Sequence, residues 1–337
     1  MKSVKVPLRS INETRKKLME KEIMNMEYKI KTSEKYGYIP LIENTDLNLD
    51  LEIVDTEFEE IKKYPKNITE LLKDELNKKE IEELKSSFDI IGNIVILEIP
   101  KNLEYKKIAI GKATLDFTKR KSVYMKKSKV HGETRIRDLE LISGIPNPIT
   151  THKEHGIRLR LNVEEVYFSP RLATERKRVQ ESVKDGEEIL DMFCGIGPFP
   201  IVISKEKKVN ITAVDINKEA IKYLNRNIEL NRLKGNITGI CGDIKEVSKN
   251  KLKNKKYNRI IMNLPGTSYE FLDLAISHLK DNGILNYYEF SDSYGKGIER
   301  IQKASKKQNK NVEILNTRKV KSTSPGIWHI AIDAKIY

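Results

Sequence analysis

Strands and helices alternate regularly from Arg171 to the end of the chain, and this alternation constrains the fold more than any other feature. Apolar segments predict seven strands. The first begins at Glu188, the second ends at Asp215 and the third ends at Asp243. The other four are expected over 259–263, 283–289, 311–320 and 327–337. Helical periodicity lies between them, over 174–184, 199–205, 218–231, 270–279 and 295–308. The pattern predicts an α/β fold with a mostly parallel, doubly wound sheet. Sheets of this kind bind ligands beyond the carboxyl ends of their strands.

The first 170 residues show a different pattern, with short strands and few helices. Residues 1–60 predict a small α+β domain, with strands over 3–7, 28–30, 36–40 and 51–58 and a helix through Glu20 that opens with the capping-box pair Ser10 and Glu13. The polar segment 61–67 contains Pro65 and predicts a linker. A second α+β domain is expected over 68–170, with a helix over 71–88, a β-turn-β unit over 89–100, short strands up to Arg160 and a strand over 162–169. A third domain then occupies 171–337.

Charge and composition narrow the classes of function. The 337 residues include 63 Lys and Arg against 49 Asp and Glu, a formal net charge of +14. This excess favours a polyanionic partner, with nucleic acid ahead of a membrane surface or a simple solubility effect. No apolar run approaches the roughly 20 residues that cross a bilayer, and the first residues lack the apolar core of a secretory signal. Cys194 and Cys241 cannot form a disulfide scaffold. We therefore expect a reduced, cytoplasmic protein.

Basic residues are densest between Lys119 and Arg137, where the acidic residue is Glu133. Like charges this close repel one another, and a phosphate backbone neutralises them with release of counterions. The pattern predicts that RNA is contacted by Lys126, Lys127, Lys129 and Arg137. The alternative is a solvated charged face.

The segment Asp191-Met-Phe-Cys-Gly-Ile-Gly197 passes from a strand through a glycine turn into a helix. Glycines let the backbone approach a ligand, and the helix N-terminus offers unpaired N–H groups. A dinucleotide site would have a third glycine where Pro200 stands. Asp215 lies where a ribose-binding carboxylate belongs, and Asp243 ends the third strand, where an adenine amino group could be bound.

This arrangement resembles the S-adenosylmethionine-binding core of class I methyltransferases. The resemblance implies a cofactor site formed by Asp191, Phe193, Gly195, Gly197, Asp215, Ile216, Asp243 and Asn263. A nicotinamide-dependent enzyme and an α/β domain with incidental Gly and Asp residues are the alternatives.

Asn263-Leu-Pro-Gly266 follows the fourth strand of this domain and resembles the N-P-P-Y type motif of methyltransferases that act on planar nitrogens. An amide side chain and a Pro-stabilised turn can hydrogen-bond the edge of a base. The aromatic residue of that motif is replaced by Gly266, so Tyr167 is the candidate for stacking on the base. A simple strand-ending turn is the alternative.

Successive blocks of the sequence resemble the archaeal and eukaryotic tRNA (guanine-37-N1)-methyltransferase family: 128–137, 151–156, 166–176, 191–199, 262–265 and 320–325. The resemblance implies that Arg135 holds the target guanine and stabilises charge on its O6, and that Glu175 removes the N1 proton. It also implies that Asn263 and Pro265 bind the base. Gly266 stands where archaeal members often have Lys.

The residue types suit this chemistry, although each also has a simpler explanation. Guanine N1 becomes nucleophilic when it loses its proton, a carboxylate can take that proton, and an Arg can stabilise the resulting charge on O6. Arg135 could instead contact phosphate, and Glu175 could complement a helix dipole. His152 and His155 lack an evident third ligand, so no metal is expected.

Together these features predict a monomeric, three-domain tRNA methyltransferase that uses S-adenosylmethionine. Residues 1–60 and 68–170 would bind tRNA, and residues 171–337 would bind the cofactor. One alternative is a bifunctional relative that also methylates carbon 7 of the wyosine precursor at the same nucleotide. An alternative of another class is a non-catalytic RNA-binding protein.

Overall fold

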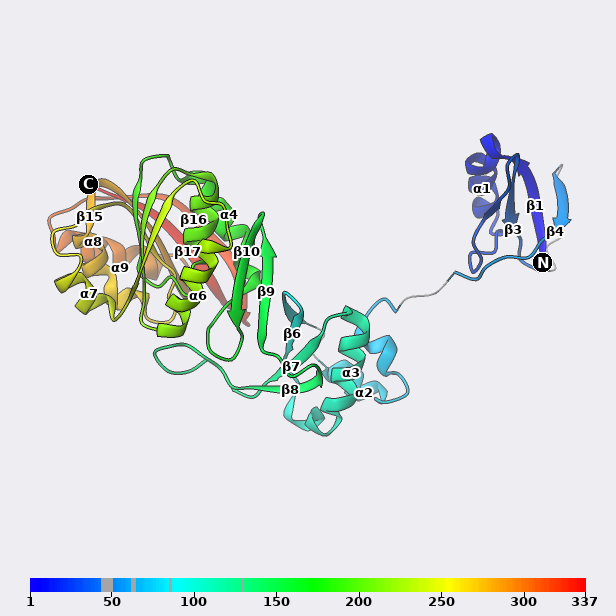
Figure 1. Ribbon diagram of the computed structural model, residues 1–337, viewed down its shortest axis with the longest axis horizontal. Helices are drawn as coiled ribbons and strands as arrows, with labels where there is room; N and C mark the ends of the chain where they lie inside the picture. The colour runs from blue at the N-terminus through cyan, green and yellow to red at the C-terminus, as the bar shows by residue number, and fades with distance from the viewer. Residues whose placement is uncertain (44–50, 62–64, 85–86, 129) are drawn as a thin grey trace. The chain divides into compact units, whose positions relative to one another are not determined.

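The computed structural model describes residues 1–43, 51–61, 65–84, 87–128 and 130–337. Its internal contacts define two compact units, Met1–Lys66 and Asn67–Tyr337 (Figure 1). The predicted linker 61–67 lies partly outside the described residues. In the described part of the chain, no helix is both long enough and apolar enough to cross a membrane.

The first unit is a four-stranded antiparallel sheet with one α-helix packed on it. The strands β1 (Lys2–Pro7), β2 (Lys31–Thr32), β3 (Tyr36–Pro40) and β4 (Glu52–Asp55) are ordered β2-β3-β1-β4. A short turn of 3₁₀-helix, η1 (Leu8–Ser10), leads into α1 (Ile11–Glu20). The alternation of Val4 and Val6 places both side chains against Leu18 of α1 and Ile39 of β3, which gives the unit a small core.

Three details predicted for this unit are wrong. The Ser10 side chain makes no capping hydrogen bond, although the helix is present. The strand predicted over 28–30 is a single bridge from Tyr28 to Glu60, because the turn at Ser33 pairs residues 31–32 with β3 instead. The strand predicted over 51–58 is confined to the residues of β4 that pair with β1.

The second unit begins with a mixed four-stranded sheet in the order β5-β6-β7-β8. Its strands are β5 (Phe88–Ile91), β6 (Ile94–Leu97), β7 (Ser122–Lys126) and β8 (Leu139–Gly144). The other elements are η2 (Ile68–Leu72), α2 (Lys78–Glu83), η3 (Lys101–Lys106) and α3 (Lys107–Thr118). The predicted β-turn-β unit over 89–100 is confirmed by the antiparallel pairing of β5 with β6.

Two predictions in this region are wrong. The long helix over 71–88 is absent: η2 ends first, and a capping box between Asn77 and Glu80 starts the short helix α2. The short strands expected after residue 100 are wrong over 107–118, which form the helix α3; its many apolar residues resemble the pattern of a strand. Gly111 lets α3 approach β8, since a Cβ there would lie 3.0 Å from Ile142.

A two-stranded hairpin, β9 (Ile149–Glu154) and β10 (Ile157–Asn162), precedes the large sheet. The strand predicted over 162–169 is wrong. The Asn162 side chain accepts a hydrogen bond from the Glu164 amide (2.9 Å) and its carbonyl accepts one from the Val166 amide (3.2 Å), which closes a turn. The chain then enters η4 (Pro170–Leu172) and α4 (Ala173–Ser182).

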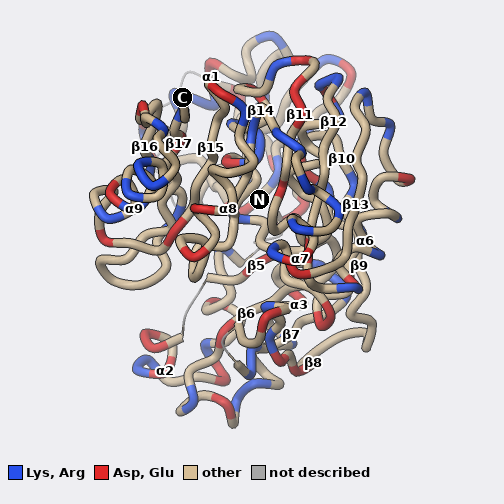
Figure 2. The backbone as a smooth tube through the Cα atoms, turned by 90° about the vertical axis from the view of Figure 1, so that its left-hand side faces the viewer, with Lys and Arg blue, Asp and Glu red and all other residues tan. Residues whose placement is uncertain are grey.

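The large sheet has seven strands in the order β13-β12-β11-β14-β15-β17-β16, which confirms the predicted α/β class (Figure 2). The first five strands in this order are parallel, and β17 is antiparallel to both of its neighbours. The strands are β11 (Glu188–Asp191), β12 (Asn210–Asp215), β13 (Asn236–Cys241), β14 (Tyr257–Met262), β15 (Leu279–Ser291), β16 (Val312–Ser324) and β17 (Ile327–Ile336). The remaining helices are α5 (Pro198–Glu206), α6 (Lys218–Glu229), α7 (Ile244–Asn250), η5 (Ser268–Phe271), α8 (Leu272–Ser277) and α9 (Gly295–Lys306).

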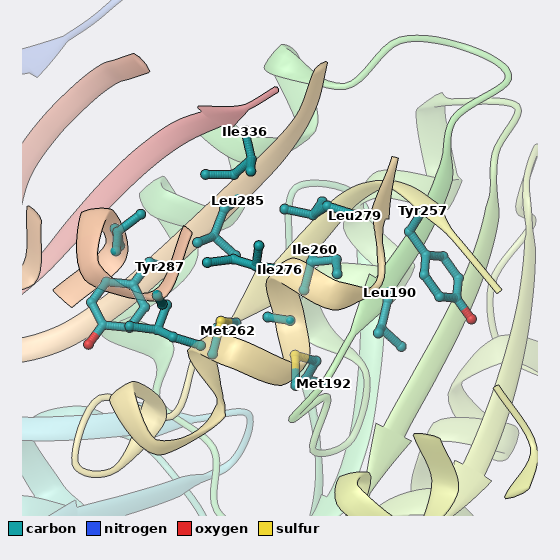
Figure 3. Close-up of a cluster of buried hydrophobic side chains, with 14 of the residues drawn as sticks. Leu190, Met192, Tyr257, Ile260, Met262, Ile276, Leu279, Leu285, Tyr287 and Ile336 are labelled. Atoms are coloured by element: carbon teal, nitrogen blue, oxygen red, sulfur yellow. The ribbon is translucent and has the colours of Figure 1, made fainter. Parts of the chain in front are cut away.

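The core of this sheet lies between its strands and the covering helices. In Figure 3, Ile276 of α8 lies among Ile260, Leu285 and Ile336, which come from three different strands. A second buried cluster joins Tyr124 of the smaller sheet to the hairpin and to Leu224 of α6. The boundary expected at residue 170 therefore stays a prediction, because apolar packing is continuous across it.

Candidate active site

A cavity of about 620 Å³ lies at the carboxyl ends of the parallel strands. The residues that follow four of these strands contribute to its wall: Phe193 after β11, Asp215 at the end of β12, Asp243 after β13 and Asn263 after β14. This is the edge of the sheet at which the sequence predicts a ligand.

Asp215 joins the glycine loop to the next helix. One of its carboxylate oxygens accepts a hydrogen bond from the Gly195 amide (2.6 Å), and the other accepts one from the Asn217 amide (2.9 Å). Gly195 has φ +54° and Gly197 has φ +84°, a region that favours glycine. The loop therefore presents backbone amides and an acceptor side chain to the cavity before α5 begins.

The cavity wall beside this loop combines the apolar side chains of Ile216, Phe193 and Phe271 with the polar side chain of Asp243. Ile216 is 38% exposed, which is unusual for a large aliphatic side chain directly after a buried strand. The rings of Phe193 and Phe271 meet edge to face with centroids 5.1 Å apart. Asp243 caps α7 by accepting from the Lys245 amide (2.6 Å). A flat heterocycle with polar edges fits such a wall.

Asp191 and Gly197, two of the predicted cofactor residues, are not among the described residues that line the cavity. Asp191 is 1% exposed and accepts a hydrogen bond from the Phe193 amide (3.3 Å). Burial, opposed by that hydrogen bond and reinforced by Asp215, raises the pKa of Asp191 to about 8. A Cβ on Gly197 would lie 2.2 Å from Leu224, so this glycine permits α5 to pack on α6.

Arg135 comes from the loop between β7 and β8 and lines the same cavity. Its backbone has φ +55°, and its amide bonds the Gly132 carbonyl (3.2 Å) in a tight turn. The guanidinium carbon lies 5.7 Å from the centre of the Tyr167 ring. Burial lowers the pKa of Arg135, which nevertheless stays cationic. Tyr167 also lines the cavity, so a cation and an aromatic face are presented together.

The turn after β14 contributes Asn263 and Pro265 to the wall. Asn263 has a buried Oδ1 without a hydrogen-bond partner among the described residues. The Pro265 carbonyl accepts from the Phe290 amide (3.0 Å), which fixes the turn to β15. A Cβ on Gly266 would lie 3.5 Å from an Arg135 nitrogen, so the turn and the arginine loop are neighbours.

Glu175 lies on α4 and is not among the described residues that line the cavity. Its carboxylate is 1% exposed and accepts hydrogen bonds from the Tyr288 hydroxyl (2.7 Å) and the Arg178 guanidinium (2.7 Å). Arg318 adds an ion pair at 3.4 Å. Two cations and a phenol therefore surround the carboxylate in this structure.

A second cavity of about 360 Å³ adjoins the first and shares Arg135, Tyr167 and Lys321 with it. Lys126 and Arg137, both predicted to contact RNA, line this second cavity. Of the other two predicted residues, Lys127 pairs with Glu104 (3.2 Å) and Glu140 (3.6 Å), and Lys129 lies outside the described residues. Figure 2 shows that basic and acidic residues are interspersed along most other elements.

Sequence reasoning missed several residues of the cavity wall: Lys245, Phe271, Phe290, Lys321 and His329. Lys321 belongs to a block quoted for the family resemblance, but no role was assigned to it. His329 gave no local signal, because the antiparallel pairing of β17 brings it to this edge from far along the chain. Among the described residues, no cluster of three or more His, Cys, Asp or Glu residues could hold a metal.

Comparisons with known proteins decide the family. The TRM5/TYW2 methyltransferase domain matches residues 150–315, the TYW2 N-terminal domain matches 68–147, and the tRNA methyltransferase 5 N-terminal domain matches 3–47. A tRNA (guanine(37)-N(1))-methyltransferase Trm5b of Pyrococcus abyssi is 41% identical and covers 99% of this chain and 98% of its own length. The chain belongs to the TRM5/TYW2 methyltransferase family.

Other members of the family extend this finding. The Methanocaldococcus jannaschii Trm5b is 37% identical over 96% of this chain and 95% of its own length. A tRNA (guanine(37)-N(1))/4-demethylwyosine(37)-methyltransferase Taw22 of Nanoarchaeum equitans is 41% identical, over 47% of this chain and 52% of its own.

Solved structures of the family are similar over the whole chain. The structure of aTrm5 with tRNALeu has a TM-score of 0.84 at 34% identity and covers 99% of both chains. The structure of M. jannaschii Trm5 with adenosine has a TM-score of 0.68 at 33% identity and covers 100% of this chain and 99% of its own.

Proposed function

We propose that this protein transfers a methyl group from S-adenosylmethionine to N1 of guanosine 37 in tRNA. One observation carries the proposal: polar groups suited to a nucleoside and polar groups suited to a guanine line the same cavity. Asp215, Asp243, Arg135, Asn263 and Pro265 all contribute to its wall. Membership of the family supports the same conclusion.

The residues present fit the proposed cofactor. The Asp215 carboxylate can accept hydrogen bonds from ribose hydroxyls, and the exposed face of Ile216 can cover an adenine ring. Asp243 can accept from an exocyclic amine. The cofactor supplies an electrophilic methyl group on a sulfonium. Asp191 and Gly197 are proposed to hold the shape of the glycine loop, because Asp191 accepts from the Phe193 amide and Gly197 lets α5 pack on α6.

The proposed roles at the base follow from donor and acceptor chemistry. The planar N–H donors of Arg135 match guanine O6 and stabilise the negative charge that develops there as N1 loses its proton. Tyr167 offers a ring face for stacking, and Asn263 offers an unpartnered acceptor. A base presented in this way must leave its stack, which a loop nucleotide does at low cost.

The proposed proton acceptor is Glu175, as the family resemblance implies. In this structure its carboxylate is occupied by Arg178, Arg318 and Tyr288. The proposal therefore requires that binding of tRNA releases one carboxylate oxygen toward the base. Catalytic hydrogen bonds are commonly completed only when the substrate binds, so a different arrangement in the free protein is compatible with this role.

The proposed RNA-binding surface includes Lys126 and Arg137, because both line the cavity next to the base site. Lys127 is proposed as a weaker contact, since two carboxylates already pair with it. RNA binding by residues 1–60 and 68–170, a monomeric state and a cytoplasmic location are parts of the same proposal.

Mass analysis of nucleosides tests this function. The purified protein is incubated with S-adenosylmethionine and an unmodified tRNA, and the tRNA is digested. The expected product is 1-methylguanosine. A protein that binds tRNA but produces no methylated nucleoside would instead be the non-catalytic RNA-binding protein.

A second candidate function is methylation of carbon 7 of the wyosine precursor as well, and the similarity to Taw22 favours it. The same incubation with tRNA that carries the precursor distinguishes the two. A mass increase of the precursor nucleoside supports the bifunctional enzyme, and an unchanged precursor supports guanosine 37 as the single target.

A further inference from the structure

A buried carboxylate on β17, that of Asp333, has no part in the proposed mechanism. The residues around it in the strand are apolar and buried: Ile330, Ala331, Ile332 and Ala334. Asp333 itself is 6% exposed. An ionised carboxylate in such surroundings is costly unless cations and hydrogen-bond donors compensate its charge. The partners of Asp333 therefore bear directly on its role.

Asp333 binds the guanidinium of Arg178 on α4 with both of its carboxylate oxygens (2.5 and 3.1 Å). One of these oxygens also accepts a hydrogen bond from the side chain of Asn286 on β15 (2.6 Å). Burial opposes the positive charge of Arg178, but the hydrogen bonds to Glu175 and Asp333 outweigh burial and raise the pKa of Arg178. Arg178 therefore stays cationic, and its contact with Asp333 is an ion pair.

Arg178 is shared between two carboxylates. Its Nε atom donates to Glu175 Oε2 (3.1 Å) and its Nη2 atom to Glu175 Oε1 (2.7 Å), and the same Nη2 atom donates to Asp333 Oδ1 (3.1 Å). Glu175 also accepts from the Tyr288 hydroxyl and pairs with Arg318. The charges of Arg178 and Arg318 thus balance those of Glu175 and Asp333. Without the charge of Asp333, both cations would be left to Glu175.

The other buried arginine of α4 provides a contrast. Arg176 is 1% exposed and donates to the two oxygens of Glu154 (2.6 and 2.5 Å) and to the Ser169 carbonyl (3.2 Å). Glu154 and a carbonyl are therefore sufficient to compensate a buried arginine on this helix. Compensation of Arg178 alone does not explain why a second carboxylate is placed beside it.

A second partner for Arg178 matters because Glu175 has to exchange partners. The proposed mechanism requires that binding of tRNA releases one Glu175 oxygen toward the base, and this release takes a hydrogen bond from Arg178. A buried cation that loses its acceptor opposes such a change. Because Asp333 binds Arg178 with both oxygens, the guanidinium keeps a charged partner when Glu175 turns away.

We propose that Asp333 is a positioning residue that holds Arg178 and thereby permits Glu175 to turn from Arg178 toward the N1 proton of the target guanine. This inference rests on the proposed function, including the role of Glu175 in it. It adds a residue that acts through Arg178 rather than by contact with the substrate.

The test measures single-turnover methyl transfer from S-adenosylmethionine to an unmodified tRNA. Asp333→Asn keeps the size of the side chain and an acceptor for Asn286 but removes the charge. It is made in the wild-type protein and in Glu175→Gln. A paired variant, Arg178→Met with Asp333→Asn, removes both members of the ion pair, which costs a fold less than removal of one member.

Glu187→Gln is the matched control. Arg259 donates to Asn286 (3.1 Å) and pairs with Glu187 (2.8 Å), so this substitution also removes a carboxylate from a buried arginine of the same network. Neither Glu187 nor Arg259 is among the described residues that line the two cavities. Melting curves and binding of tRNA and S-adenosylmethionine establish that each variant is folded.

Asp333→Asn is expected to slow transfer by about tenfold, the value of one charge-assisted hydrogen bond, without loss of affinity for tRNA or S-adenosylmethionine. In the Glu175→Gln protein the same substitution is expected to have no further effect, because it acts through Glu175. The paired variant is expected to transfer faster than Asp333→Asn, since the cation that retains Glu175 is also gone. Glu187→Gln is expected to keep the wild-type rate even if it melts at a lower temperature.

Three results overturn the inference while the proposed function stands: a folded Asp333→Asn variant at the wild-type rate, an equal loss in the wild-type and Glu175→Gln proteins, or a paired variant no faster than Asp333→Asn. If Asp333→Asn does not fold, a paired variant within about tenfold of the wild-type rate supports the inference, and a slower one overturns it.

Two further results concern the proposed function itself. A Glu175→Gln protein that transfers methyl at the wild-type rate removes Glu175 as the proton acceptor, and this inference falls with that role. Absence of transfer by the wild-type protein overturns the proposed function.

Discussion

At the scale of single residues, two buried carboxylates of the site lie in opposite surroundings. Asp191 has one backbone amide as its partner and a neighbouring Asp215, so its charged form is poorly compensated. Glu175 is surrounded by Arg178, Arg318 and the Tyr288 hydroxyl. Asp191 is therefore tested by measuring stability, and Glu175 is tested by measuring methyl transfer.

The pKa of Asp191 predicts a pH-dependent stability. The folded protein holds this proton up to about pH 8, whereas the unfolded chain loses it near 3.8, so unfolding becomes easier as the pH rises between these values. The contribution is on the order of 1 kcal/mol for each pH unit in that interval. Asp191→Asn removes it and is expected to be more stable than wild type at pH 8.5 and similar at pH 4.5. The pKa of Asp215 is also raised by burial, so Asp215 contributes a dependence of the same sign that persists in Asp191→Asn.

Urea unfolding of both proteins at pH 4.5, 6.5 and 8.5 measures this difference. The same dependence of unfolding free energy on pH in the wild type and in Asp191→Asn would show that Asp191 is not protonated in the folded protein.

Glu175→Gln tests the proposed proton acceptor. The amide keeps the shape but cannot take the N1 proton, so single-turnover methyl transfer is expected to fall by roughly 10²-fold or more. Binding of tRNA and cofactor is expected to persist. Raising the pH is expected to recover part of the rate, because solvent can then take the proton.

Arg135→Ala is the comparison, because it removes stabilisation of the charge on O6 and higher pH should rescue it less. A Glu175→Gln variant that transfers methyl at the wild-type rate at neutral pH would leave Glu175 with a structural role beside Arg178 and Arg318.

At the scale of elements, local pattern was sufficient for the parallel part of the large sheet. These strands end at or shortly before a polar residue, such as Asp215 at the end of β12 and Asn263 after β14. Each predicted helix between them is present, although α7 was not predicted. Local pattern failed at α3, whose apolar residues imitate a strand, and at 162–169, where the Asn162 side chain closes a turn. It could not identify His329, because the partners of an antiparallel strand are set by the whole sheet.

The attachment of the β9–β10 hairpin to α6 gives a prediction at this scale. Asn227 is fully buried, and its side chain bonds the backbone of Arg160 in both directions (2.7 and 3.1 Å) and the Ile196 carbonyl (3.2 Å). Asn227→Ala leaves these groups unsatisfied and is expected to lower the free energy of unfolding by about 2–3 kcal/mol.

Asn231→Ala is the matched control, because the half-buried Asn231 makes the same two-way contact with the backbone of Arg158 and also donates to the Asn227 carbonyl, at a site that water can reach. Its expected loss is under about 1 kcal/mol. Equal losses in urea unfolding for the two variants would show that burial of the Asn227 contact is not what stabilises the hairpin.

At the scale of the whole molecule, the net charge of +14 leads us to expect that the proposed tRNA binding weakens as the salt concentration rises. Combined Lys126→Ala and Arg137→Ala substitutions, both in the second cavity, are expected to lower tRNA affinity and to flatten its dependence on log salt by about 0.7–0.9 for each lost phosphate contact. Lys127→Ala is expected to change the slope less, because Glu104 and Glu140 already neutralise it. A slope that is unaltered in the double variant would remove this surface from the phosphate contacts.

Position-specific methyl transfer tests the central claim most directly. The wild-type protein is given labelled S-adenosylmethionine and one of two tRNA transcripts that are identical except for guanosine or adenosine at nucleotide 37. The account predicts label in 1-methylguanosine with the first transcript and background label with the second, since Arg135 and Asn263, the proposed contacts to guanine, line the cavity. Equal label in the two transcripts, or label in any other nucleoside of the first, would contradict it.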